Sequence, residues 1–308
     1  MANQRSRVKS ARGTEPNVGI RLKFAKKLLT LFRSFEQKVL VEVLTELGDG
    51  KLLAMDASLT NPAKGADPRL LEQLSRQIMA DFKRNPQRAK QNVESFIQRN
   101  LARWTREVGD EGKKIAVWLA RNLSADVTAS QRRALQAAGL PSDFLKQRWT
   151  VPTGKGYISP TTARLLPALV EETTGLITRM TADNLARIQE VIVTGMSEGE
   201  SFFDLKRTLG TLKGFDETRV KTVAIDQTNK ISQGIQRGND ADLGIRQGVW
   251  VHVPGQYTSR QTHREFHGKV FDLDKGLFDE DVGKYVLPAE CINCRCFYKP
   301  VIPKDIFK

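Results

Sequence analysis

The sequence predicts a mainly α-helical protein that ends in a small α+β unit. Three observations support this fold class. Apolar residues recur at the 3.6-residue spacing of a helix through most of the first 248 positions. Strand-like runs occur only after Gly248, as short segments bounded by Pro and Gly. At 308 residues, the chain is long enough for more than one compact unit.

We expect four consecutive parts. Residues 1–19 form a basic flexible arm, disordered or ordered by a partner, because they hold few large apolar side chains that could offset the entropy of ordering. Residues 20–150 form a basic, all-helical module. Residues 151–248 form a helical stem, and residues 249–308 form a small Cys/His-rich α+β unit.

The first expected helix covers residues 21–47. Its apolar stripe runs from Leu22 to Leu47, and Gly48 ends it. Basic side chains fill most of its other face: Lys23, Lys26, Lys27 and Arg33. Further helices are expected near residues 68–83, 86–108, 113–123, 130–138 and 144–148.

The stem begins with residues 151–160, which we expect to form a linker or exposed loop. A helix is expected over 161–193, followed by the run 202–212 and by a helix from 216 to 237 that Gly238-Asn239-Asp240 closes. The β-type runs cover residues 249–253, 269–273 and 296–302, with Trp250 in the core of the small unit.

Charge is distributed unevenly along the chain. The formal net charge is +14, and residues 1–150 carry 28 Lys and Arg against 15 Asp and Glu. The remaining residues carry 21 against 20. A polycationic half suits nucleic acid, an anionic membrane surface or an acidic protein, although solvated helix faces of uneven sign would give the same count.

The sequence does not favour membrane insertion or secretion. No apolar run approaches the roughly 20 residues that cross a bilayer, and no apolar stretch of a signal peptide follows the basic start. Three clustered cysteines are too few for a disulfide framework, so we expect a protein made and kept in a reducing cytoplasm.

Several short motifs follow one another in the second half. They are the helix segment Arg219-x-x-x-x-Ala224-Ile-Asp-Gln-Thr228, the run from Gly244 to Trp250, Arg260-x-x-His263, Gly268, Pro288 and Asn293-Cys294-Arg295-Cys296. In this order and spacing, roughly residues 160–303 resemble the C-terminal domain of Mu F-like phage head morphogenesis proteins, also called minor head or minor capsid proteins.

The resemblance implies a low-copy, non-enzymatic virion protein that is made in the host cytoplasm. It would associate with the portal and other head proteins during capsid assembly and DNA packaging, contact packaged DNA, and travel with the DNA on ejection. It implies no membrane and no small-molecule substrate. The chain departs from the family at Gln256, where an aspartate is usual, which weakens any shared catalysis. It also has Cys291 where many relatives have histidine, which keeps a metal-capable side chain.

All three histidines and all three cysteines lie between His252 and Cys296. Cys294 and Cys296 on a strand would share a face, and Cys291 would fold in from the preceding loop. With His263, or alternatively His267, as fourth ligand, these residues predict a closed and therefore structural zinc site. The competing interpretation is that the cysteines are small buried hydrophobic residues and that His263 hydrogen-bonds a carbonyl.

Five other residues of the motifs are expected to serve architecture or partner contact: Trp250, Arg260, Gly268, Asn293 and Arg295. Asp226 and Gln227 could form a polar tie between helices or a solvated edge. The basic half could contact DNA phosphates, or helix 21–47 could lay its apolar face in a partner's groove. We prefer the second, because the stripe is broad and an aromatic stacking platform is lacking.

The alternative function is a DNA-binding or metal-dependent nuclease accessory protein. His263, His267, Asp272 and Asp274 could be arranged around a metal, with Arg260 and Arg264 on phosphate. Three thiolates, however, make a poor site for the Mg²⁺ that such chemistry uses.

Overall fold

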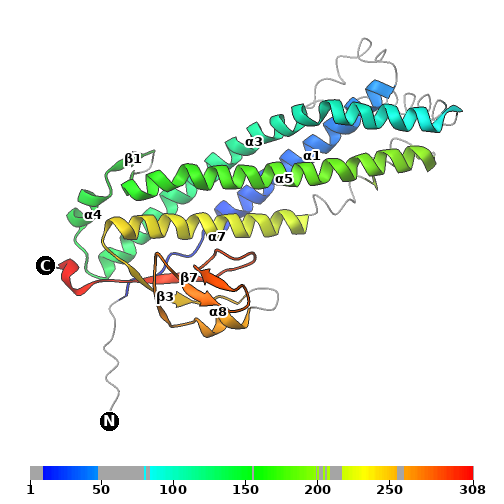
Figure 1. Cartoon of the computed structure of the whole chain (residues 1–308). Coiled ribbons are helices and arrows are strands. Elements are labelled where there is room, and N and C mark those ends of the chain that lie inside the picture. Colours follow the sequence, from blue (N-terminus) through cyan, green and yellow to red (C-terminus); the bar gives the residue numbers. More distant parts are fainter. Residues whose placement is uncertain are drawn as a thin grey trace. The chain divides into compact units, whose positions relative to one another are not determined.

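A computed structural model gives the fold of the chain (Figure 1). It describes residues 10–47, 80, 84–154, 156–198, 200, 204, 207–208, 217–254 and 260–307. The helix expected near residues 68–83 and the run 202–212 fall largely outside these ranges. By their internal contacts the residues group into two compact units. One comprises the chain up to Ala25, Ala116–Thr173 and Lys221–Lys308, and the other comprises Lys26–Ile115 and Thr174–Val220.

The chain is mainly helical, as predicted, with a small C-terminal unit of antiparallel strands. The long helices are α1 (Val18–Leu47), α3 (Pro86–Ala137), α5 (Pro160–Glu198) and α7 (Glu217–Asp242), and each contributes residues to both compact units. Each unit combines segments that are far apart in sequence. The predicted division of the chain into four consecutive parts, with boundaries after residues 19, 150 and 248, therefore stays a prediction. Among the helices that the structure describes, none is both long and apolar enough to cross a bilayer.

Helix α1 turns its apolar stripe inward. Six of its large apolar side chains are buried, although Val18 and Leu22 near its start are exposed. The buried ones are Phe24, Leu28, Phe32, Phe35, Val39 and Val43. The basic residues Lys23, Lys26, Lys27 and Arg33 are exposed. The stripe is therefore used within the chain, which corrects the interpretation that it lies in a partner's groove. What helix α1 offers to a partner is its basic face.

Helix α3 is one helix of 52 residues, where the sequence predicted three shorter ones over 86–108, 113–123 and 130–138. Gly109 and Gly112 lie between the first two of these predicted helices. A Cβ on Gly112 would lie 2.9 Å from Cγ2 of Ile177 on α5, so this glycine allows a close helix contact instead. The continuous helix ends at Ala137, before α4 (Ser142–Arg148).

Helix α7 also runs past its predicted end. Gly238, expected to close the helix, lies inside it, and a Cβ there would come within 2.6 Å of the Thr162 hydroxyl oxygen. Asn239 and Asp240 are fully buried. The helix ends at Asp242, and Gly244 follows with a positive φ of 75°.

Residues 151–160, expected to form a loop, include a short antiparallel hairpin. Strand β1 (Val151–Thr153) pairs with β2 (Gly156–Ile158). The strands are only three residues long, which is too short for an alternating apolar pattern that would predict them.

The C-terminal strands form a three-stranded antiparallel sheet of order β4-β3-β7. Its members β3 (Gln247–Val251), β4 (Val270–Asp272) and β7 (Phe297–Val301) confirm the three predicted runs. The short helix α8 (Gln261–Glu265) lies between β3 and β4 in sequence. A second hairpin of β5 (Leu277–Asp279) and β6 (Lys284–Val286) was not predicted, and a 3₁₀ turn, η2 (Lys304–Phe307), closes the described chain.

Residues 10–14, the described end of the predicted arm, lie along the edge of β7. Ser10 forms a bridge with Val301, and the Ala11 N–H donates to the Pro300 carbonyl. A Cβ on Gly13 would lie 2.5 Å from the carbonyl oxygen of Tyr298. This part of the arm is therefore ordered by the chain's own sheet.

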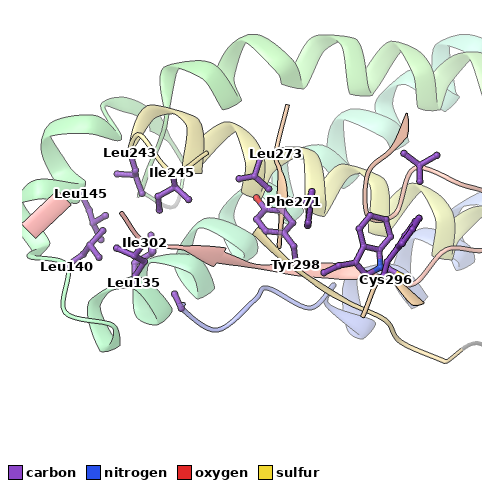
Figure 2. Close-up of a cluster of buried hydrophobic side chains, with 14 of the residues drawn as sticks. Leu135, Leu140, Leu145, Leu243, Ile245, Phe271, Leu273, Cys296, Tyr298 and Ile302 are labelled. Atoms are coloured by element: carbon purple, nitrogen blue, oxygen red, sulfur yellow. The ribbon is translucent and has the colours of Figure 1, made fainter. Parts of the chain in front are cut away.

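A large cluster of buried hydrophobic side chains joins the C-terminal sheet to the end of α3 and to α4 (Figure 2). Along β7, Ile302 lies with Leu135 and Leu140 near one end, and Cys296 lies at the other. Helix α7 adds a buried polar face: Gln227, Thr228, Asn229, Ser232, Gln233, Gln236, Asn239 and Asp240. Several of these side chains hydrogen-bond the elements around them, as Gln236 does to Thr14 and to the carbonyl of Tyr298.

Candidate functional site

Three of the predicted metal ligands come together in the C-terminal unit. Nδ1 of His263, on α8, lies 3.5 Å from Sγ of Cys294 and 3.7 Å from Sγ of Cys296. The ligand atoms of these three residues all lie within 4.8 Å of one another, and all three residues are buried. The structure thus contains a His/Cys cluster that could bind a metal ion.

Cys291 and His267, the other two candidates, are placed differently. Cys291 belongs to a second group of ligand atoms within 4.8 Å, together with His263 and Asp279. His267 is exposed, and its Nδ1 accepts a hydrogen bond of 3.1 Å from the backbone N–H of His252. Among the described residues, the two groups therefore share His263 and neither includes His267.

Two residues at the cluster were not proposed as ligands or partners from sequence. Nδ1 of His252 lies 3.6 Å from Sγ of Cys296. The fully buried carboxylate of Asp279 places Oδ2 3.1 Å from Nε2 of His263. His252 lies in the same sequence window as the other donors, but its place beside Cys296 depends on the register of β3 with β7. Asp279 ends a three-residue strand that no pattern predicted.

The pKa values of the two buried thiols, Cys294 and Cys296, are shifted in opposite directions. A hydrogen bond from Cys294, with His263, His252 and Trp250, lowers the pKa of the Cys296 thiol far below its usual range. The same bond and burial raise the pKa of Cys294. Burial lowers the pKa of His263, but hydrogen bonds with Cys291 and Cys296 outweigh it and raise that pKa to about 9.

The turn that carries the cysteines is held from outside the sheet. The Cys294 N–H donates to the carbonyl of Cys291, and Asn293 has a positive φ of 61°. The Asn293 N–H donates to Oδ1 of Asp226 on α7 at 2.8 Å. Nη1 of Arg260 donates to the carbonyl of Ile292 at 3.2 Å. Motif residues that are far apart in sequence thus fix one turn.

The remaining motif residues shape the surroundings of His263. Trp250 is fully buried, and its ring meets that of His263 edge to face at 5.5 Å. Gly268 has a positive φ of 80° and donates its N–H to the Trp250 carbonyl at 2.8 Å, a backbone conformation that favours glycine.

Arg295 and Asp226 meet at the edge of the site. Burial raises the pKa of the Asp226 carboxyl, and the Asn293 N–H, Arg295 and Arg260 act in the opposite direction. The neighbouring Gln227 accepts a hydrogen bond of 3.0 Å from Thr173 on α5. The sequence left open whether Asp226 and Gln227 form a polar tie between helices or a solvated edge. Gln227 forms such a tie, between α7 and α5.

Sulfur and imidazole nitrogen are the donors that zinc prefers in proteins, and the donor set of the cluster fits that ion. The carboxylates of the nuclease interpretation are engaged elsewhere. Oδ1 of Asp272 accepts the N–H groups of Asp274 and Lys275 in its own turn. Asp274 lies 3.6 Å from Arg246.

Comparison with known proteins places this site within a known family region. The sequence model of the family described as Phage Mu protein F like protein matches residues 186–299. The chain is also 24% identical, over 131 residues, to a Bacillus subtilis (strain 168) protein named "Uncharacterized protein YqbB". That match spans 39% of this chain and 42% of the relative, and no solved structure matches. Residues 186–299 are therefore similar to the Phage Mu protein F like family, which confirms the resemblance predicted from Trp250, His263 and the Asn293–Cys296 run.

Proposed function

We propose that this chain is a structural minor head protein of a tailed phage. In this proposal it associates with the portal during capsid assembly and DNA packaging, and it can leave the head with the DNA. The observation that carries the proposal is the match over residues 186–299. The matched region includes the residues that the structure joins around one turn and one cluster: Asp226, Trp250, Arg260, His263, Asn293 and Cys296.

The geometry of the cluster supports an architectural role over a catalytic one. His263 and Cys296 are each only 3% exposed, so a substrate would have little access to them. Buried sulfur ligands suit a closed structural site, whereas metal-dependent cleavage of nucleic acid uses oxygen ligands and an open coordination position. Asp272 and Asp274, which a nuclease would need, are bound in a turn and beside Arg246.

The exposed basic face of α1 supports contact with an anionic partner. Lys23, Lys26, Lys27 and Arg33 form this face. Inside a phage head, both packaged DNA and acidic patches of other head proteins would meet that requirement. This same feature is what favours the DNA-binding alternative, with or without a role in the virion.

Mass spectrometry of purified procapsids and virions from the encoding phage tests the structural role. We expect peptides of this chain in procapsids, and we expect the chain to co-purify with the portal from cells that produce them. Absence from both particles would refute the proposal. A plasmid-nicking assay with Mg²⁺ or Mn²⁺ tests the alternative. We expect wild type and His263→Ala to be equally inactive, and nicking that requires His263 would favour the nuclease.

A further inference from the structure

The C-terminal sheet brings four nitrogen and sulfur donors together from three places in the sequence. His252 follows β3, His263 lies in α8, and Cys294 and Cys296 precede β7. The register pairs Val251 with Phe297, so the next residues along the two strands, His252 and Cys296, face each other across the ladder. The family match gives only a range of residues and does not say that these four donors lie close together.

Three of the distances between these donors match those of a zinc site, and His252 is the outlying donor, because it belongs to neither group of ligand atoms that lie within 4.8 Å of one another. With Zn–N of about 2.1 Å, Zn–S of about 2.3 Å and a tetrahedral angle of about 109°, neighbouring N and S ligands lie about 3.6 Å apart. The three N···S distances are 3.5 Å for His263 to Cys294, 3.7 Å for His263 to Cys296, and 3.6 Å for His252 to Cys296. Sγ of Cys294 and Sγ of Cys296 lie within 4.8 Å of each other.

Asp279 fixes which nitrogen of His263 is available. Its Oδ2 lies 3.1 Å from Nε2 of His263, and its Oδ1 accepts the Asp281 N–H at 3.0 Å. When Nε2 of His263 carries the proton, it donates a hydrogen bond to the Asp279 carboxylate. In this tautomer, Nδ1 has a lone pair that points toward the two sulfur atoms. A carboxylate behind a metal-binding histidine commonly sets its tautomer and orientation in this way.

We propose that His252, His263, Cys294 and Cys296 bind one Zn²⁺, with Asp279 as the residue that positions His263. This ligand set replaces the predicted Cys291 by His252. Neither residue belongs to the group of His263, Cys294 and Cys296, so the fourth ligand has to move toward the other three when the ion binds. His252 is chosen because its Nδ1 already lies 3.6 Å from Sγ of Cys296. Four protein ligands close the coordination sphere, so the ion is structural. It ties β3, α8 and the approach to β7 together in a unit whose strands are three to five residues long.

Metal analysis of the full chain, purified without a histidine tag, tests the site directly. We expect about one zinc per chain in wild type and in the control variant His267→Ala. Cys291→Ser, which tests the choice between Cys291 and His252, should also keep its zinc. His252→Ala and Cys294→Ser should retain less than about a tenth of that zinc. A folded wild-type chain without metal, and with no zinc uptake on titration, would overturn the proposal. Zinc lost from Cys291→Ser but kept by His252→Ala would overturn the choice of His252.

X-ray absorption at the zinc edge of the wild-type chain gives a reading that does not depend on whether variants fold. We expect two sulfur neighbours at about 2.3 Å and two nitrogen neighbours at about 2.0–2.1 Å. Three sulfur neighbours would contradict the ligand set and restore the Cys₃His prediction. Neither outcome depends on whether the chain is found in phage particles, so this test and that of the proposed function can fail separately.

Discussion

Asp240 on α7 is a fully buried carboxyl group with two side-chain donors. Its Oδ2 accepts the Tyr298 hydroxyl at 2.8 Å, and its Oδ1 accepts Nε2 of Gln131 at 2.7 Å. Burial raises its pKa to about 7, although both hydrogen bonds act to lower it. The folded chain therefore holds this proton more tightly than the unfolded chain, in which the pKa is about 3.9.

This shift gives the folded state a pH dependence of definite sign. The contribution of a raised carboxyl pKa is complete below the unfolded value and is lost as pH rises through the folded value. Between pH 5 and pH 8, wild type should lose up to about 3 kcal/mol of unfolding free energy that Asp240→Asn does not lose. Urea unfolding at both pH values measures this. Asp143→Asn, at an exposed position of α4, is the control, and its unfolding free energy should change with pH as that of wild type does. Equal pH dependence in wild type and Asp240→Asn would show that Asp240 is ionised in the folded chain.

Asp279 offers a second test, which rests on the proposed zinc site. Asp279→Asn keeps the shape of the side chain but weakens its bond to Nε2 of His263. We expect zinc affinity to fall about 10- to 100-fold, as for other carboxylates behind metal-binding histidines. Competition with a chromophoric chelator measures the change. Asp281→Asn is the matched control, because its backbone N–H to Asp279 is kept. Unchanged affinity in Asp279→Asn would remove Asp279 from the site.

At the residue scale, sequence spacing predicted only part of the cluster. Cys294 and Cys296 stand two apart, so an extended backbone puts them on one face. Of the pair His263 and His267, it is His263 that lies beside them. His252 could not be selected, because its position opposite Cys296 depends on the register of β3 with β7. Asp279 reaches His263 only through the β5–β6 hairpin, whose strands are too short to leave a pattern.

Elements were predicted best where apolar spacing was long and continuous, as in α1, and worst where a helix contains glycine. Gly112 in α3 and Gly238 in α7 each sit where another segment comes close, so both helices continue through them. A glycine chosen for close packing and a glycine that ends a helix look alike in sequence, since the difference lies in a neighbour far along the chain.

The two glycines of α3 give a matched pair for testing this explanation. A Cβ on Gly109 would lie 3.5 Å from Oγ1 of Thr178, an ordinary contact, so Gly109→Ala should stabilise the helix by up to about 1 kcal/mol. A Cβ on Gly112 would lie 2.9 Å from Cγ2 of the β-branched Ile177, so Gly112→Ala should give no gain or a loss. Thermal unfolding of both variants beside wild type checks the order. A stabilising Gly112→Ala would mean that the helices are not held at this distance.

At the scale of the whole molecule, the sequence anticipated the class of the fold and the division of charge, but not the use of α1. Its apolar stripe suited a partner's groove as well as the chain's own core, because a buried stripe has the same spacing in either case. The structure buries Phe24, Leu28 and Phe32 and leaves the lysines exposed. The basic side chains of α1 are thereby the part of this helix that a partner would meet.

Salt dependence shows whether that partner is nucleic acid. If α1 lies against DNA phosphates, the logarithm of the binding constant should fall linearly with the logarithm of salt concentration, with a slope of about −0.9 for each phosphate neutralised. Replacing Lys23, Lys26 and Lys27 together by Gln should then make the slope less steep by about 2.7, equally for duplexes of unrelated sequence. Fluorescence anisotropy between 50 and 200 mM salt measures it, and replacing the exposed Gln37 by Asn controls for the substitution itself. A slope that the triple variant leaves unchanged would place the DNA contact elsewhere and leave the basic face of α1 to an acidic head protein.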